Sequence, residues 1–256
     1  PFVKRGKNDR NDAEAICEAA SRPSMRSVPV KSAESQAEAM DLSARGLLVR
    51  QRTQLINAVR GHLAEFGIIE AQGAWNLPRA LAHLETGGEL PEVARQVLQL
   101  LAAQLDEAEQ RIEDLDTQIA VWHKASPVSQ RLATIPGIGP LVATAIAATV
   151  PNADAFRSGR EFAAWLGLVP RQRSTGGKQR LGRISRAGDG YIRRLPIIGA
   201  QAVLLRSKAA HADPWVQGLL ARRPRLVVAA ALANKTARVA WAVMTKGQPY
   251  RQPAAA

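Results

Sequence analysis

Two adjacent hydroxyl side chains, Ser174 and Thr175, stand directly before the pair Gly176-Gly177. Glycine adopts backbone angles with φ > 0 at little cost, so the Gly-Gly pair predicts a tight turn that can approach a ligand closely. Eight cations surround this turn: Arg171, Arg173, Lys178, Arg180, Arg183, Arg186, Arg193 and Arg194. A hydroxyl ringed by cations is suited to hold the phosphate of a polyanion such as a nucleic acid, or to attack it.

Two carboxylates near the start of the chain, Asp9 and Asp12, are three positions apart. In a helix that begins by Asp9 they share one face, and carboxylate oxygens are ligands for a hard cation such as Mg²⁺. The spacing alone favours a simpler interpretation, in which both acids are stabilised at a helix N-terminus by the helix dipole. A Mg²⁺ site also needs further ligands, and the sequence places no obvious carboxylate beside this pair.

Charge is distributed unevenly along the 256 residues, whose formal net charge is +13. From Arg131 onward there are 20 Lys and Arg against 4 Asp and Glu, whereas the first 130 residues have 15 against 18. Such asymmetry indicates a nucleic-acid-binding surface in the C-terminal part. The alternative is a solvated basic face that only aids solubility.

Several classes of protein and site are disfavoured by composition. Cys17 is the only cysteine, so an internal disulfide and a cysteine zinc site are excluded, as is usual in a reducing cytoplasm. The four histidines have no metal-ligand spacing. The sequence shows no apolar run of about 20 residues, as a membrane span needs, and no signal peptide. Because the chain begins with Pro1, we expect it to start inside a longer protein.

Helical periodicity predicts the elements that must position these residues. A short helix is expected to about Ala20, capped by Asn11 or Asp12, and a long one from Ser32 to a C-cap at Gly67, with Ile56, Val59, Leu63 and Phe66 on its apolar face. A connector with a short helix near 79–84 leads to a second long helix over about 91–124. Its apolar residues alternate three and four apart as an a/d seam: Leu98, Leu101, Leu105, Ala108, Ile112, Leu115, Ile119 and Trp122. The two long helices predict an antiparallel hairpin, whose seam serves either intrachain packing or self-association.

The segment 132–146 contains Pro-Gly-Ile-Gly-Pro between apolar runs, a pattern typical of a helix-hairpin-helix. Gly137 and Gly139 expose backbone N–H groups at a helix N-terminus, where a phosphate can bind. The alternative is a plain packing unit of two helices. Further helices are expected over 156–166, 192–207 and 226–244, with a disordered tail from Gln248. The sequence therefore predicts a mainly α fold.

Four motifs in this order resemble one family over essentially the whole chain. They are KNDRNDAEAI, PGIGP, GLVPRQRSTGGKQRLGRISRAGDGYIRRL and ALANKTARVAWAV. The chain is similar to the DEDD-type insertion-sequence transposases of family one-ten, which include the eleven-eleven subgroup. The resemblance implies an N-terminal RuvC-like (RNase H-like) α/β domain, a coiled coil and a C-terminal serine transposase domain. It also implies recombination guided by a structured RNA, often called bridge RNA.

By this resemblance, Asp9 and Asp12 correspond to the third and fourth acids of the DEDD set, which binds Mg²⁺, and Ser174 to the serine nucleophile, with Thr175 its competitor. The eight cations around the turn are implied to contact DNA or RNA phosphates. The first Asp and the Glu of the set have no counterpart in this chain. Only a C-terminal remnant of the RuvC-like domain is therefore expected, over 1–30, followed by the coiled-coil hairpin (31–124) and the transposase domain (125–256).

The resemblance leads us to expect a bacterial cytoplasmic transposase. Its expected partners are DNA and a guide RNA, its expected cofactor is Mg²⁺, and its expected assembly is a homodimer or homotetramer without a membrane. Two alternatives remain open: a truncated, catalytically inactive nucleic-acid-binding fragment, and a structural oligomerisation protein. The oligomerisation protein leaves the basic C-terminal part unexplained.

Overall fold

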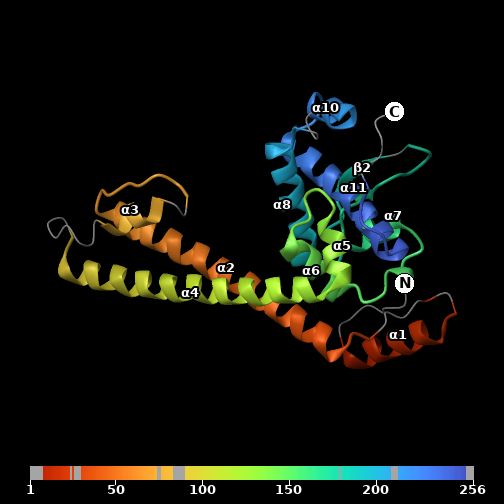
Figure 1. Cartoon of the computed structure of the whole chain (residues 1–256), viewed down its shortest axis with the longest axis horizontal. Coiled ribbons are helices and arrows are strands. Elements are labelled where there is room, and N and C mark those ends of the chain that lie inside the picture. The colour runs from red at the N-terminus through yellow and green to blue at the C-terminus, as the bar shows by residue number, and fades with distance from the viewer. Residues whose placement is uncertain are drawn as a thin grey trace.

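The computed structural model describes residues 8–23, 25, 30–73, 76–82, 90–178, 180–208 and 213–251. The described chain is mainly helical, which confirms the predicted fold class (Figure 1). In order, its elements are α1 (Asp9–Ser21), α2 (Ala33–Glu65), α3 (Leu77–Ala82), α4 (Glu92–Ala125), α5 (Pro127–Ala133), α6 (Pro140–Thr149), the 3-10 turn η2 (Ala153–Ala155), α7 (Gly159–Trp165), β1 (Pro170–Gln172), β2 (Leu181–Ile184), α8 (Gly190–Arg206), α10 (Pro214–Leu220) and α11 (Arg225–Lys246).

The helix α1 begins earlier than the sequence predicted. Its N-cap is Asn8, whose side chain accepts a hydrogen bond from the Asn11 backbone N–H at 2.8 Å, rather than Asn11 or Asp12. Asn8 satisfies one of the free N–H groups of the first turn, so the helix starts at once. No residue of α1 is buried. The helix therefore does not contribute to either hydrophobic core.

The two long helices α2 and α4 lie side by side and run in opposite directions (Figure 1). Their distal halves share a hydrophobic cluster that includes Val59 and Leu63 of α2 and Leu98 and Leu105 of α4. All eight predicted seam residues of α4 are buried or half-buried, as the 3-4 spacing predicted. Phe66 was wrongly predicted to pack there: as the C-cap it lies past the last helical turn and is 42% exposed.

The distal end of α2 is closed by a Schellman motif, which explains why the helix ends where the sequence predicted. Gly67 has φ +77°, and its N–H donates to the Ala64 carbonyl. The Ile68 N–H donates to the Leu63 carbonyl, and both of these side chains are buried in the distal cluster. Glycine adopts this left-handed angle without strain, so the turn brings Ile68 back onto the helix.

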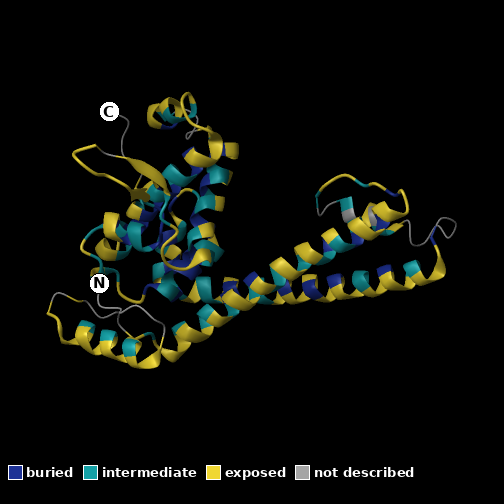
Figure 2. Cartoon of the chain, turned by 180° about the vertical axis from the view of Figure 1, so that it is seen from behind, coloured by how far each residue is buried: buried dark blue, intermediate teal, exposed yellow. Residues whose placement is uncertain are grey.

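The remaining helices form a second, larger core around α11. Phe162 of α7, Leu132 of α5 and Val228 of α11 are fully buried in it. Ile119 of α4 and Leu42 of α2 belong to the same cluster, so the proximal end of the α2/α4 pair is built into the C-terminal body. The pair therefore projects from this body as a long arm (Figures 1 and 2).

Between α4 and α5 the chain turns sharply at Ser126. The Ser126 hydroxyl accepts a hydrogen bond from the Ser129 N–H at 3.2 Å, and Pro127 occupies the first position of α5. The buried Ser129 hydroxyl is 2.7 Å from His123 Nδ1 and 3.2 Å from the Thr144 hydroxyl. These bonds tie the end of α4 to α5 and α6.

The helix α11 is long and apolar enough to span a membrane by length and composition, and it is the one such helix in the described residues. In this structure its small apolar face packs against α7 and α8, with Val228, Ala233 and Ala240 fully buried. Burial within the C-terminal core accounts for its apolar composition.

Three sequence predictions of elements need correction. The predicted helix over 156–166 is shorter than expected, because Ser158 caps α7 by accepting from the Glu161 N–H and so starts the helix at Gly159. The helix α10 was missed, although Asp213 followed by Pro214 is a strong start signal and Asp213 does cap it. The two strands were missed as well. Of the predicted short helix near 79–84, positions 83 and 84 lie outside the described residues, as do positions 252–256 of the predicted tail.

Candidate nucleic-acid interface

A two-stranded antiparallel ribbon presents the Ser-Thr-Gly-Gly turn at its tip. β1 and β2 pair with Pro170 opposite Ile184 and Gln172 opposite Leu181, and an irregularity between these pairs indicates a bulge. The pairing continues toward the tip, where the Arg173 N–H donates to the Arg180 carbonyl at 2.8 Å. Almost the whole ribbon is exposed, and it extends away from the helices (Figures 1 and 2).

The turn itself has the geometry of a two-residue hairpin. Thr175 and Lys178 are bridged by reciprocal backbone hydrogen bonds, and the two residues between them, Gly176 and Gly177, have φ of +54° and +75°. Positive φ at both central positions is the type I′ arrangement, which matches the twist of the flanking strands. The Gly-Gly pair, which predicted a tight turn, thus closes a β-hairpin.

The base of the ribbon is held by close contacts between backbones. Gly167 has φ +73°, and a Cβ there would lie 2.3 Å from the Ala187 carbonyl oxygen. A Cβ on Gly188 would lie 2.4 Å from the Trp165 carbonyl oxygen. Only glycine fits at these two positions, where the strands enter and leave the body. The Asn234 side chain of α11 also donates to the Leu168 carbonyl, at 3.3 Å. The base is therefore anchored while the tip is exposed.

Both candidate hydroxyls at the tip, Ser174 and Thr175, are exposed. Within the described part of the chain, neither side chain hydrogen-bonds to an acid or a histidine that could act as a base. A serine or threonine hydroxyl is a weak nucleophile until a base or an ion activates it. The ribbon thus supplies a hydroxyl and cations but no activating group.

The predicted cationic contacts fall into two groups. Arg171, Arg173, Lys178, Arg180, Arg183 and Arg186 lie on the ribbon or at its base and are exposed, as is Arg194 on α8. Arg193 and Arg171 also bind the backbone: the Arg193 guanidinium donates to the Ala187 carbonyl at 2.8 Å, and Arg171 Nε donates to the Ser185 carbonyl at 3.2 Å. Both therefore hold the segment that leaves the ribbon. Arg186 has φ +57°, an uncommon conformation for a non-glycine residue, and its N–H donates to the Gly167 carbonyl.

The predicted helix-hairpin-helix segment consists of α5, a turn and α6, and the turn packs against α8. Gly137 has φ +86°, and the backbones of Gly137 and Gly199 touch, since a Cβ on Gly199 would lie 1.9 Å from the Gly137 carbonyl oxygen. Gly139 is the N-cap of α6 and gives no side-chain cap, and Pro140 follows it. The N–H groups of Leu141 and Val142 therefore have no capping side chain, a state compatible with the predicted phosphate contact.

A cavity of about 580 Å³ opens beside this turn, between α2, the α5–α6 turn and α8. Its lining includes Arg45 and Gly46 of α2 and Tyr191 and Arg194 of α8. The guanidinium of Arg45 binds both carboxylate oxygens of Asp116 on α4, at 2.5 and 2.9 Å. The Asp116 hydrogen bond raises the pKa of Arg45, whereas burial raises the pKa of Tyr191 more than the nearby Arg45 lowers it. The sequence reasoning missed this junction, although Gly46 in mid-helix signals close packing.

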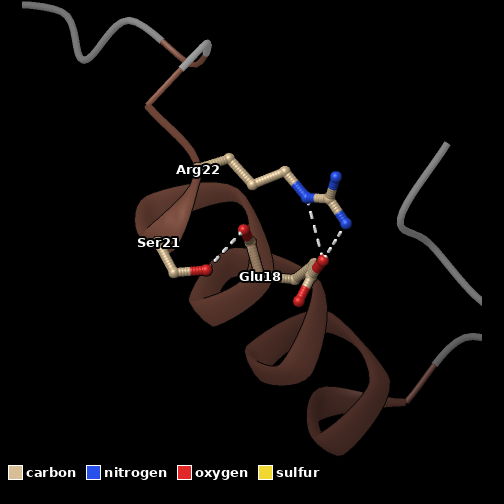
Figure 3. A network of polar contacts seen from close by, with 3 residues as sticks. All are labelled: Glu18, Ser21 and Arg22. Carbon is tan, nitrogen blue, oxygen red and sulfur yellow. Dashed lines mark hydrogen bonds and ion pairs between the residues drawn. The ribbon is translucent and has the colours of Figure 1, made fainter.

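The predicted metal ligands Asp9 and Asp12 are both exposed in the first turn of α1 and lie on one face, three residues apart. Among the described residues, no group of three or more His, Cys, Asp or Glu side chains could hold a metal ion. Further along α1, the Glu18 carboxylate is bound by the Arg22 guanidinium (Figure 3). The helix thus offers two carboxylates and no complete metal site.

The structure does not bring the acids and the hydroxyls together. In both views α1 lies below the C-terminal body, whereas the ribbon extends from the side of the body, well above α1 (Figures 1 and 2). A site that combined them would need a second chain or a different arrangement of α1.

Comparison with known proteins identifies relatives of this chain. The sequence model described as Transposase IS116/IS110/IS902 family matches residues 129–215, which contain the α5–α6 turn, the ribbon and α8. The chain is 50% identical to a Pseudomonas aeruginosa protein described as a "Probable family 20 transposase", over 98% of the chain and 76% of that protein.

Two further relatives are transposases named for insertion sequences. The chain is 41% identical to the transposase for insertion sequence element IS1111A of Coxiella burnetii, over 98% of the chain and 70% of that protein. It is also 41% identical to the transposase for insertion sequence element IS1328 of Yersinia enterocolitica, over 98% of the chain and 75% of that protein. The chain spans 66% to 76% of the length of the four relatives that match nearly all of it. This chain therefore belongs to the IS116/IS110/IS902 family of insertion-sequence transposases.

Proposed function

We propose that the protein is a DNA transposase of an insertion sequence that uses a ribbon-tip hydroxyl to attack a DNA phosphodiester. The observation that supports this most directly is the exposed ribbon, which presents two hydroxyls among cations in a chain of a transposase family. We further propose that it acts in the bacterial cytoplasm on element ends and target DNA.

In the proposed step, the hydroxyl oxygen forms a bond to phosphorus and the P–O3′ bond breaks. The 5′-phosphate is then linked to the protein, and the DNA keeps a free 3′-hydroxyl. The proton of the attacking hydroxyl passes to water, and the leaving O3′ takes a proton from water. Ser174 is the nucleophile by family resemblance, and Thr175 is the competing hydroxyl. Ribbon cations such as Arg173 and Arg180 stabilise the charge that develops on the phosphate.

Magnesium would polarise the phosphate or help the hydroxyl ionise if it were bound. Asp9 and Asp12 could supply two oxygen ligands, but they do not form a complete site within the described residues. We therefore propose that further ligands come from outside this chain.

The partners are also proposals. A guide RNA would choose the target by base pairing, as in other RNA-guided systems, and would leave this chain to bind backbones. The separation of α1 from the ribbon favours a composite site built from two protomers, which a homodimer or homotetramer would supply.

A second candidate function is nucleic-acid binding without chemistry. It is favoured by the incomplete acid pair and by the absence, in the described part of the chain, of a base beside the hydroxyls. In that case binding would use the same ribbon and the uncapped N-terminus of α6, and no covalent intermediate would form.

Covalent capture separates the two functions. The chain, and a version extended upstream in the gene, are mixed with labelled DNA ends, cognate RNA and Mg²⁺, then run under denaturing conditions. A labelled protein band with the extended version supports the transposase proposal. Retention of DNA under native conditions without any band from either version supports binding alone. Loss of the band in Ser174→Ala or in Thr175→Ala identifies the nucleophile.

A further inference from the structure

A second group of exposed cations lies where the end of α8 meets the turn between α10 and α11. The Arg225 guanidinium donates to the Leu204 carbonyl at 3.0 Å, which brings this turn against the last residues of α8. The group, which we call the α8–α10 corner, consists of Arg206, Lys208, Arg222 and Arg223. It is built from other elements than the ribbon, and α10 lies at the end of the body away from α1 (Figure 1).

Acidic residues do not balance the charge of this corner. Asp213 is the only Asp or Glu that follows Asp189 in the sequence. Its carboxylate already accepts hydrogen bonds from Lys235 Nζ at 3.4 Å and from the Trp215 backbone N–H at 2.8 Å. Within the described residues, none of the four corner cations forms an ion pair. Exposed cations without counter-charge are typical of a surface that binds a polyanion.

An exposed aromatic ring, that of Trp215, distinguishes the corner from a plain basic patch. Trp215 is 40% exposed, whereas the other tryptophans in the described part of the chain are half-buried. Lys235 Nζ lies 4.7 Å from the centroid of its ring, and Asp213 caps the helix at its backbone N–H. The ring is therefore held in place and still accessible. An accessible ring among cations is suited to stack on an unpaired base.

The ring and one corner cation are joined by a bare strip of helix surface. Trp215, Gly218 and Arg222 follow one another at spacings of three and four along α10 and the turn that continues it, so they are neighbours on one face. A Cβ at Gly218 would meet nothing within 4 Å. Glycine is less favourable than alanine within a helix, but here it leaves room for the close approach of a ligand.

Apolar side chains complete the corner. Leu205, Leu226 and Val227 are each more than half exposed and are next to the residues that join α8 to α11. A duplex keeps its bases stacked and presents only their edges in the grooves, whereas an unpaired strand can offer the apolar faces of its bases. Cations, a ring and apolar side chains together therefore match an unpaired strand better than a duplex.

We propose that the α8–α10 corner binds an unpaired nucleic-acid strand, with a base stacked on Trp215 and phosphates bound by Arg222 and the other corner cations. The inference adds a second surface to the proposed function. It is tested by binding alone, so this test and covalent capture can fail independently. RNA and DNA strands share the chemistry that the corner recognises, and the experiment compares the two.

Substitutions at Gly218 test the corner while sparing the fold. Gly218→Ala and Gly218→Glu both introduce a better helix former into open space, so both should keep the thermal stability of the unaltered chain. Fluorescence anisotropy measures binding to a single-stranded DNA, to an RNA of the same sequence and to duplex DNA. We expect Gly218→Glu to weaken binding of a single strand by about five-fold or more, because its carboxylate repels the phosphates, and Gly218→Ala to stay within about two-fold.

Substitutions at Trp215 test the stacking itself. Trp215→Leu keeps an apolar side chain but removes the aromatic face, and it should weaken single-strand binding by about 5- to 100-fold while duplex binding changes by less than about two-fold. Trp215→Phe should retain most of the affinity. The strand that is bound more tightly, RNA or DNA, identifies the source of the ligand.

Three results would overturn the inference. The first is single-strand binding that neither Gly218→Glu nor Trp215→Leu weakens. The second is an equal loss of single-strand and duplex binding in Trp215→Leu. The third is binding to vesicles that contain phosphatidylserine, in place of either strand and lost in the same variants, which would assign the corner to a membrane surface.

Discussion

Gly46, in the middle of α2, faces the edge of the Tyr191 ring on α8, and a Cβ at position 46 would lie 2.9 Å from Tyr191 Cε2. The contact joins the projecting helix pair to the C-terminal body at the side of the 580 Å³ cavity. We expect Gly46→Ala to destabilise the protein by about 1–3 kcal/mol, because the ring is half-buried and has to shift.

A matched control lies on the same helix. A Cβ at Gly61 would meet nothing within 4 Å, so Gly61→Ala should stabilise α2 by about 0.5–1 kcal/mol through helix propensity alone. Urea unfolding of both variants measures the difference. If Gly46→Ala is as stable as Gly61→Ala, the ring contact at position 46 does not constrain the junction.

The ionisation of Tyr191 should report on the same junction. Burial raises its pKa, with Arg45 opposing, so the folded state favours the neutral phenol. A folded pKa above the unfolded one contributes stability that is complete below the unfolded pKa, about 10, and is lost as pH rises through the folded pKa. The protein should therefore lose stability in the alkaline range.

Ultraviolet absorbance of tyrosinate checks this expectation. The chain has two tyrosines, so Tyr250→Phe leaves Tyr191 as the sole reporter. Its titration midpoint should be higher in the folded than in the urea-unfolded protein. Arg45→Met should move the folded midpoint higher still, because it removes a positive charge that favours the phenolate. Coincident folded and unfolded midpoints would contradict the burial of the ring.

The parts of the fold that could be predicted from the sequence are those set by residues close together in the chain. The α2 and α4 helices followed from local periodicity, since apolar residues such as Leu98 and Leu105 recur on one face. The strands did not, because an exposed ribbon has no apolar alternation, and its Gly-Gly turn by itself indicates only a tight turn. The contact of Gly46 with Tyr191 joins distant segments, and neither residue reveals its partner.

The candidate site was predictable in composition but not in arrangement. The cations from Arg171 to Arg194 were all identified, yet the sequence did not predict the paired strands that present Ser174 and Thr175 on an exposed ribbon. Likewise, the sequence around Arg193 does not indicate that its guanidinium donates a hydrogen bond to the Ala187 carbonyl.

The salt dependence of DNA binding should depend on the ribbon cations. Replacing both Arg173 and Arg180 by glutamine should weaken the dependence of the DNA-binding constant on salt. The slope of log binding constant against log salt concentration should fall in magnitude by roughly 0.9 for each duplex phosphate that the variant no longer neutralises. Arg111→Gln, at an exposed position on the projecting arm, is the control and should leave the slope unchanged. Fluorescence anisotropy over a salt series measures both. An unchanged slope in the ribbon variant would place the phosphate contacts elsewhere.

The backbone contact between Gly137 and Gly199 predicts that position 199 does not tolerate a side chain. Gly199→Ala would place a methyl group 1.9 Å from the Gly137 carbonyl oxygen, so α8 and the α5–α6 turn must separate. We expect the free energy of unfolding to fall by about 3 kcal/mol or more, because a packed backbone cannot move aside as a flexible side chain can. Gly218→Ala on α10 has open space and is the control. Thermal unfolding compares them, and similar melting temperatures would refute the close contact.

The length of α4 gives the arm a mechanical consequence. At about 1.5 Å per residue, the 34 residues of α4 extend roughly 50 Å. The proximal end of the helix is held where the chain turns at Ser126 and where Arg45 binds Asp116. A tilt of about 5° at that fulcrum moves the far end by roughly 4 Å, nearly one helical turn. The arm is thus a lever. A small shift at the Gly46–Tyr191 contact becomes a larger displacement at the far end of the arm, and a force applied to the far end acts with greater magnitude at the cavity beside α8.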